Sequence, residues 1–121
     1  MSTWDEALNL RANATAALAA AGLDVVVVLD GADAMNNLLS GADVLLIPPP
    51  RIERTGTALE VQTWTMFGIC HQSDDVTEWW PALDAMTEAI AEPLEIETSE
   101  ARWWTTIQGN EFPATQYTTT T

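Results

Sequence analysis

Cys70 and its neighbour His71 are the first side chains to consider for chemistry. A thiolate next to a histidine is a common nucleophile, and both side chains also bind metals. We expect both residues on one long strand, where adjacent side chains point to opposite faces of the sheet. They would then not share a task, and one histidine without a second ligand is a poor start for a metal site. A structural or surface role for His71 is expected.

Acidic pairs are the remaining candidates. Asp74 and Asp75 could bind a cation or act in catalysis, but they also precede a predicted helix, where the helix dipole favours negative charge. Asp30 and Asp33 lack the spacing of a calcium loop, and the sequence has no phosphate-binding glycine loop or serine nucleophile elbow. We therefore predict no catalytic site, no cofactor and no metal. A small enzyme built from Asp74, Asp75 and His71 stays open as an alternative.

Composition indicates one acidic domain over residues 1–121. The chain has 121 residues, 47% of them hydrophobic, and 18 acids against 4 arginines give a net charge of −14. Such a surface repels phosphate, which argues against sequence-independent binding of nucleic acid. It either serves solubility or forms a wall past which DNA slides. No apolar run is long enough for a membrane span, and the acidic first residues predict synthesis in a cytosol without a secretory signal.

The elements that must position these residues begin with a helix over residues 3–21. Thr3 and Glu6 have the spacing of a capping box, and Gly22 is placed to end the helix. Alanine and leucine share one stripe at helical spacing, which predicts a helix that lies close against a sheet.

Strands are predicted next, at residues 24–29 and 43–47. The four consecutive valines in the first predict a strand covered on both faces, and residues 34–40 between the two fit a helical turn. Three prolines, 48–50, end the second strand. A long strand over 58–71 follows, and we expect its face with Val61, Phe67 and Ile69 to meet the helices.

An amphipathic helix follows from about residue 78 to 91, with Thr77 as its N-cap and Pro81 in its first turn. Three strands complete the chain, at residues 94–98, 102–108 and 112–120. Gly109-Asn110 predicts a hairpin between the last two. The fold class is thus α+β, with two helices packed on one face of a largely antiparallel β-sheet.

Several residues are candidates for contact with a partner. Arg51 and Arg54 place positive charge on a predicted loop of an acidic molecule, which is either a solvated loop or a contact to an acidic neighbour. Trp64 shares a strand face with polar side chains, and Trp103 and Trp104 must point to opposite faces, so we expect at least one exposed indole ring. Core packing is the alternative for any single tryptophan, and as a set they favour a protein with partners. The candidate subunit interface comprises Arg51, Arg54, Trp64, Trp103, Trp104, Tyr117 and Thr118.

The last residues, 117–121, have strong β propensity and no charge. They are either a frayed end or a segment that pairs with the open sheet edge of a neighbouring chain.

The order of elements resembles the tail terminator proteins of long-tailed bacteriophages. An N-terminal helix leads into a short apolar strand, and a second strand, 43–47, ends in prolines. A long strand over 59–70 is followed by a Ser73-Asp74-Asp75 cluster that introduces an amphipathic helix, and residues 113–118 resemble the closing strand. The resemblance covers most of the chain and is one of organisation.

The resemblance implies a homohexameric ring at the head-proximal end of the tail tube of a virion. Such a ring ends tube growth and joins the tail to the head connector, so its partners are further copies of itself, the tail tube protein and the head–tail connector protein. DNA passes through the lumen without specific binding, and neither a membrane nor a cofactor is involved. Two alternatives remain: another phage neck or minor tail protein, or an acidic regulatory module that mimics DNA.

Overall fold

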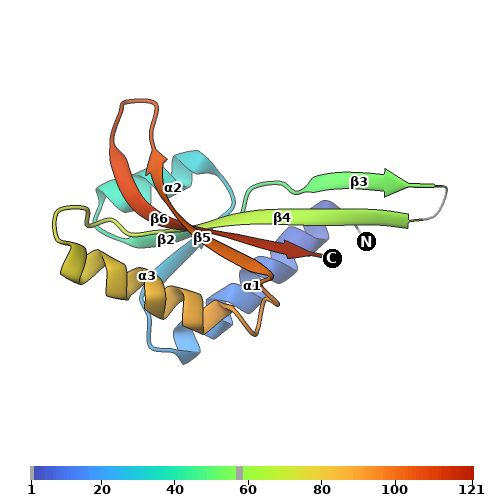
Figure 1. Cartoon of the computed structure of the whole chain (residues 1–121), viewed down its shortest axis with the longest axis horizontal. Helices are drawn as coiled ribbons and strands as arrows, with labels where there is room; N and C mark the ends of the chain where they lie inside the picture. The colour runs from blue at the N-terminus through green and yellow to red at the C-terminus, as the bar shows by residue number, and fades with distance from the viewer. Residues whose placement is uncertain (1, 57–58) are drawn as a thin grey trace.

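The computed structural model describes residues 2–56 and 59–121, and within them the chain forms three helices and one six-stranded sheet (Figure 1). The helices are α1 (Thr3–Ala20), α2 (Gly31–Leu39) and α3 (Val76–Ile90). The strands are β1 (Val25–Val28), β2 (Asp43–Leu46), β3 (Arg51–Thr55), β4 (Leu59–Ile69), β5 (Thr98–Thr105) and β6 (Glu111–Thr120). The predicted α+β class is confirmed.

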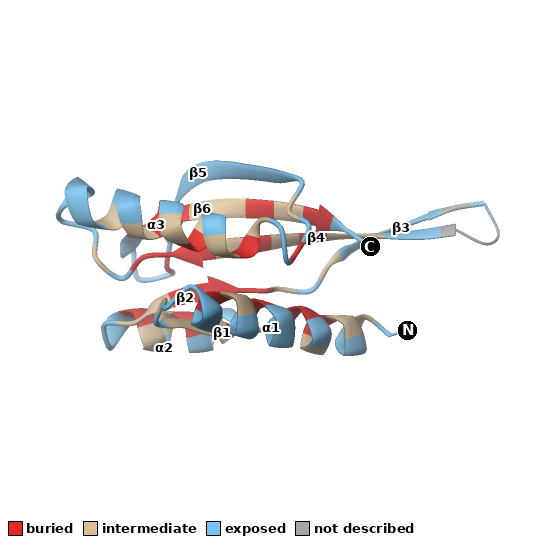
Figure 2. Cartoon of the chain, turned by 90° about the horizontal axis from the view of Figure 1, so that it is seen from below, coloured by how far each residue is buried: buried red, intermediate tan, exposed pale blue. Residues whose placement is uncertain are grey.

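The sheet has the strand order β1-β2-β4-β6-β5, and β3 pairs with the first half of β4. Only the pair β1–β2 is parallel, as expected for two strands joined by the crossover helix α2. β2 covers Phe67–Ile69 of β4, while β3 lies further along the same edge, against Leu59–Thr63. The β3–β4 hairpin therefore extends beyond the rest of the molecule, and β3 is exposed (Figure 2).

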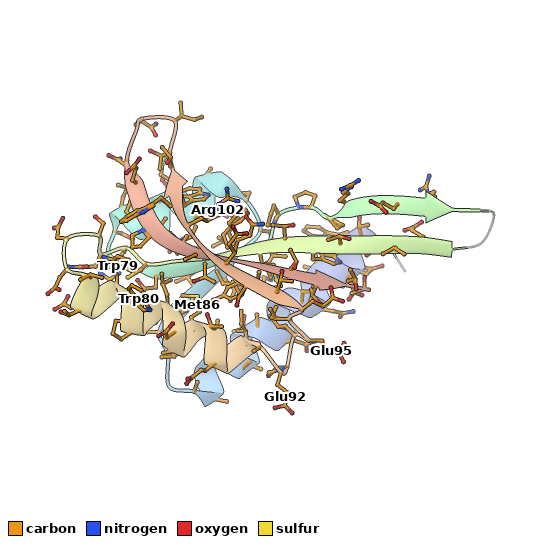
Figure 3. The ribbon with its side chains drawn as sticks, in the orientation of Figure 1. Trp79, Trp80, Met86, Glu92, Glu95 and Arg102 are labelled. Atoms are coloured by element: carbon orange, nitrogen blue, oxygen red, sulfur yellow. The ribbon has the colours of Figure 1, made fainter. Side chains whose placement is uncertain are left out.

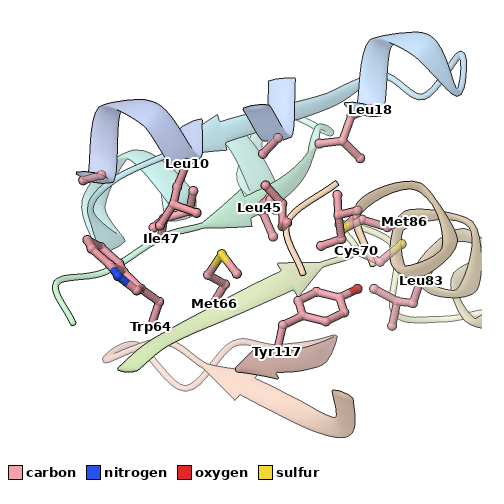
Figure 4. Packing of buried hydrophobic residues seen from close by; sticks show 14 residues of the cluster. Leu10, Leu18, Leu45, Ile47, Trp64, Met66, Cys70, Leu83, Met86 and Tyr117 are labelled. Carbon is pink, nitrogen blue, oxygen red and sulfur yellow. The ribbon is translucent and has the colours of Figure 1, made fainter. Parts of the chain in front are cut away.

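The two faces of the sheet carry separate hydrophobic clusters. One cluster joins α1 and α3 to β2, β4 and β6 through residues such as Leu10, Leu45 and Met86 (Figure 4). The other joins α2 to the opposite face through Leu38, Val44 and further residues. The helix count was thus too low by one: residues 31–39 form a full helix, capped by Asp30, whose Oδ1 accepts from the Asp33 amide at 2.8 Å.

The face of β4 that meets α1 and α3 was predicted wrongly. Trp64, Met66 and Cys70 belong to the cluster with these helices, whereas Phe67 and Ile69 pack in the cluster with α2. The polar residues Glu60 and Gln62 misled the prediction, because they lie on the hairpin, where no helix covers the strand. The four valines of β1 alternate between the two clusters, so the strand is covered on both faces, as predicted.

Helix ends differ from the sequence patterns by one or two residues. Ser2, rather than Thr3, caps α1 by accepting from the Asp5 amide at 3.1 Å, and Gly22 ends the helix with a φ of 73° as expected. Asp75, rather than Thr77, caps α3, so Pro81 lies in the second turn inside the helix. Among the described residues, no helix combines the length and the hydropathy needed to cross a bilayer.

The C-terminal strands are shifted relative to the prediction. Residues 94–97 form turns and loop, and β5 begins at Thr98 and ends at Thr105. The hairpin at Gly109-Asn110 is confirmed, with the Thr106 amide donating to the Asn110 carbonyl at 2.9 Å. The segment 117–121 is neither frayed nor free for a partner: β6 lies between β4 and β5, and Thr121 exchanges two backbone hydrogen bonds with Gln62.

α3 approaches the sheet most closely at Gly68. A Cβ added there would lie 2.5 Å from the Met86 sulfur and 3.0 Å from the Tyr117 ring. We predict that Gly68→Ala lowers the free energy of unfolding by about 1–3 kcal/mol, because the added methyl group overpacks this contact. Denaturant titration measures the change.

Gly31→Ala is the matched control, since an added Cβ there meets nothing within 4 Å and the glycine has no positive φ. It should leave the protein unchanged or more stable by up to about 1 kcal/mol. Equal destabilisation by both substitutions would contradict the assigned packing of α3.

Candidate functional site

Asp43, Cys70 and His71 meet where β2 begins and β4 has ended. Their potential ligand atoms all lie within 4.8 Å of one another. The backbone amide of His71 donates to Asp43 Oδ1 at 3.0 Å, and the ring atom Nδ1 lies 2.6 Å from the same oxygen. The prediction that Cys70 and His71 diverge on a strand was wrong, because β4 stops at Ile69 and the alternation of faces stops with it.

Cys70 is a poor nucleophile in this setting. Burial raises the pKa of its thiol to about 11, a backbone hydrogen bond with Gln72 opposes this, and the Asp43 carboxylate adds to the rise by its charge and its hydrogen bond. The group is therefore a neutral thiol near pH 7, where nucleophilic attack and metal binding both need the thiolate.

As a metal site, the cluster offers the nitrogen, sulfur and oxygen donors that zinc accepts. Two ligands of a tetrahedral zinc ion lie about 3.3 Å apart, given metal–ligand distances near 2.0 Å. His71 Nδ1 and Asp43 Oδ1 are closer than this, at 2.6 Å, which is a hydrogen-bond distance. In the described geometry the three residues form a polar cluster that links the start of β2 to the end of β4 through hydrogen bonds to Asp43.

The other acidic candidates are explained by helix capping. Asp75 Oδ1 accepts from the Thr77 amide at 2.9 Å and from its hydroxyl at 2.6 Å, and these bonds lower the pKa of the Asp75 carboxyl. Asp30 caps α2 in the same way, and Asp74 is exposed. The predicted place of Asp74 and Asp75 before a helix is confirmed.

The raised pKa gives a testable prediction for Cys70. Its thiolate fraction should rise about tenfold per pH unit up to about pH 11, so alkylation by iodoacetamide should be slow at pH 7 and accelerate throughout this range. Mass spectrometry at timed intervals measures the rate. Asp43→Asn should speed the reaction at a given pH, because it removes the negative charge that opposes thiolate formation. A rate that levels off near pH 8 would refute the assignment.

The predicted interface residues separate into a buried and an exposed group. Trp64 and Tyr117 have 0% relative exposure, and the Tyr117 hydroxyl lies 2.7 Å from Thr87 Oγ1 (Figure 4). Thr118 is half-buried, and its hydroxyl hydrogen-bonds to that of Thr98 on the edge strand β5. Of the two positions open for Trp64, exposed or in the core, the structure has the core, because its strand face carries α1. These three residues belong to the fold and are not an open contact surface.

The exposed group begins with the two arginines of the hairpin. Arg51 and Arg54 lie on strand β3, rather than on the predicted loop, and their side chains are 78% and 75% exposed. Each has an acidic neighbour in the same hairpin: Arg51 pairs with Glu53 at 2.8 Å, and Arg54 with Glu60 at 3.5 Å. Exposed pairs of this kind stabilise a fold little, so both guanidinium groups are available to a partner.

A second exposed surface lies where β5 meets α3. Trp103 points to the face of α3 and Trp104 to the other face, as predicted, where it packs near Phe112. Trp79 stacks on Trp80 and meets Trp103 edge to face (Figure 3). Trp80 and Trp103 are 59% and 51% exposed. Trp80 was not among the predicted interface residues, although adjacent residues on a helix cannot both face one core.

Three strand edges are unpaired among the described residues, because β1 and β5 end the strand order and β3 lies off it. β3 pairs only with β4, and β5 pairs only with β6. β5 is at the end of the strand order, and the open edge of β3 faces the opposite way, towards the side of β4 where β2 lies. Neither β3 nor β5 contains a proline, and the charges that commonly protect such edges are denser on β3, with Arg51, Glu53 and Arg54, than on β5, with Glu100 and Arg102.

No relative of the chain was found among known proteins. The chain has no significant match to a protein-family model, to a curated protein or to a solved structure.

Proposed function

We propose that the protein is a structural subunit of a phage virion, a tail terminator that forms a ring at the head-proximal end of the tail tube. In this role it ends tube growth and joins the tail to the head connector, while DNA passes through the lumen. The resemblance in the order of elements motivates the specific role, and the open strand edges support assembly from identical copies.

The observation that carries the proposal is the opposite orientation of the open edges on β3 and β5, two of the three open edges of the described sheet. A surface that contacts a different surface of the next copy produces a head-to-tail assembly, which closes into a ring when the rotation allows it. Ring closure through these two edges would pair both of them in every copy, and β1 would remain an open edge. The resemblance, rather than the geometry, suggests six copies.

The charge fits the same role. With a net charge of −14, the surface repels the phosphates of DNA, as the wall of a DNA channel should. Half of the four positive charges lie on β3, on a hairpin that projects from the body. In a ring, this hairpin would contact the acidic surface of a neighbour.

The same charge favours a second candidate, an acidic module that mimics DNA and occupies a basic partner. A module of this kind would work as a monomer or dimer and bind a DNA-binding protein. Another neck or minor tail protein is a third candidate, and the genes beside the coding sequence would separate it from a terminator.

Native mass spectrometry tests the proposed ring. We expect a closed oligomer, with six copies as the expected number, either for the protein alone or after the addition of tail tube protein. Electron micrographs should then show the ring at one end of each tube, with tubes of uniform length. A protein that stays monomeric at every concentration and with tube protein present would contradict the proposal.

A further inference from the structure

We propose that strand β3 of one copy adds to the open edge of β5 in the next copy as an antiparallel strand, with Ile52 opposite Trp103. The contact would join the sheets of neighbouring copies into one continuous sheet. The inference rests on the proposed ring and specifies the contact that builds it.

The backbone groups of these residues are free for such pairing. Gln62 and Thr121 exchange hydrogen bonds, so the polar groups of Gln62 point to β6 and away from β3. Ile52 is the register partner of Gln62, and its own amide and carbonyl must therefore face the open edge. The same alternation holds on β6, where the Pro113 carbonyl accepts from the Cys70 amide on β4 and so points away from β5. Trp103 is the register partner of Pro113 on β5, and its amide and carbonyl therefore face the open edge.

The strand direction follows from the topology. β5, β6, β4 and β3 are successively antiparallel, so β3 runs opposite to β5. Rotation about a ring axis that continues the sheet preserves these directions in the next copy. β3 therefore meets the neighbour's β5 antiparallel, and the face with α1 and α3 stays on the same side of both sheets.

Side chains select the register among those that the backbone allows. With Ile52 opposite Trp103, Glu53 is opposite Arg102 on the α2 face, and a β-branched residue pairs with an aromatic ring on the α3 face. Ile52 is 41% and Trp103 51% exposed in the isolated chain, so both gain burial. A shift by two residues towards the start of β5 would set Glu53 opposite Glu100, which is unfavourable, and a shift the other way would set it opposite Trp104 and lose its charge pair.

Arg54 gains a favourable environment in the same register. It is placed opposite Ala101, which lines a hollow of about 140 Å³ together with Trp80 and Asp84. The Asp84 carboxylate and the exposed Trp80 ring suit a guanidinium group through charge pairing and a cation–π contact. Both apolar and charged groups of β3 thus find complements on one surface of the neighbour.

Charge reversal on each side of the contact tests the proposal. Glu53→Arg and Arg102→Glu should each weaken ring association by about tenfold or more, because each places like charges opposite each other. An equimolar mixture of the two variants should assemble again, since every contact between unlike copies then pairs an arginine with a glutamate. Native mass spectrometry should show alternating copies. Arg11→Glu, an exposed substitution on α1, is the control and should assemble as the unaltered protein does.

A disulfide test fixes the register. Cys70→Ala removes the native thiol, and Ile52→Cys with Trp103→Cys should then cross-link adjacent copies into a covalent ladder, because paired Cα atoms about 5.5 Å apart suit a disulfide. Ile52→Cys with Ser99→Cys is the control and should stay uncross-linked, as Ser99 lies about 13 Å further along the strand.

The outcomes separate the contact from the proposed function. The unaltered protein could form rings while the mixture of charge-reversal variants fails to assemble and the Ile52→Cys, Trp103→Cys variant fails to cross-link. This result would overturn the proposed contact but not the proposed ring. A protein that never assembles, even on tube protein, would overturn both. Circular dichroism of each variant confirms that it is folded.

Discussion

The rest of the structure depends on the pairing of β4 with its neighbouring strands. This strand of 11 residues pairs with β2 and β3 along one edge and with β6 along the other. Its Trp64 and Met66 complete the core under α1 and α3, and Phe67 and Ile69 contribute to the core under α2. A slip of one residue would exchange these two sets between the faces. Gly68 opposes such a slip, since only a residue without a side chain fits against Met86 and Tyr117.

Local patterns predicted most of the elements but could not place them against each other. The valine run, the apolar stripe of α3 and Gly109-Asn110 each act over a few residues, and each predicted its element correctly, although Val76 and Trp80 of the stripe are exposed. The faces of β4 were predicted wrongly, because its polar Glu60 and Gln62 reflect the exposed hairpin instead of the sheet, a fact of tertiary structure. β5 was misplaced for a similar reason: its residues are exposed on both faces, so no alternation of apolar and polar side chains marks where it begins.

The geometry of the site depends on where β4 ends, which could not be predicted from the sequence. A strand that ended two residues later would separate Cys70 from His71, and the actual end at Ile69 brings both to Asp43. Asp43 is 27 positions before Cys70, and nothing local links them. The place of Asp74 and Asp75 just before a helix was predicted, because it is a local pattern, although the cap itself was assigned to Thr77 instead of Asp75. The open edges on β3 and β5 could not be predicted, since an edge exists only once the strand order is known.

The central position of β6 has a consequence for the order of folding. β6 is the last strand in the chain, yet it separates β4 from β5 and supplies Tyr117 to the larger core. Until it inserts, one edge of β4 has no partner, and β5 has no strand to join. Completing the sheet therefore requires contacts between distant parts of the chain, which slows folding and makes it cooperative. On the ribosome, one edge of β4 would therefore stay unpaired until β6 has emerged.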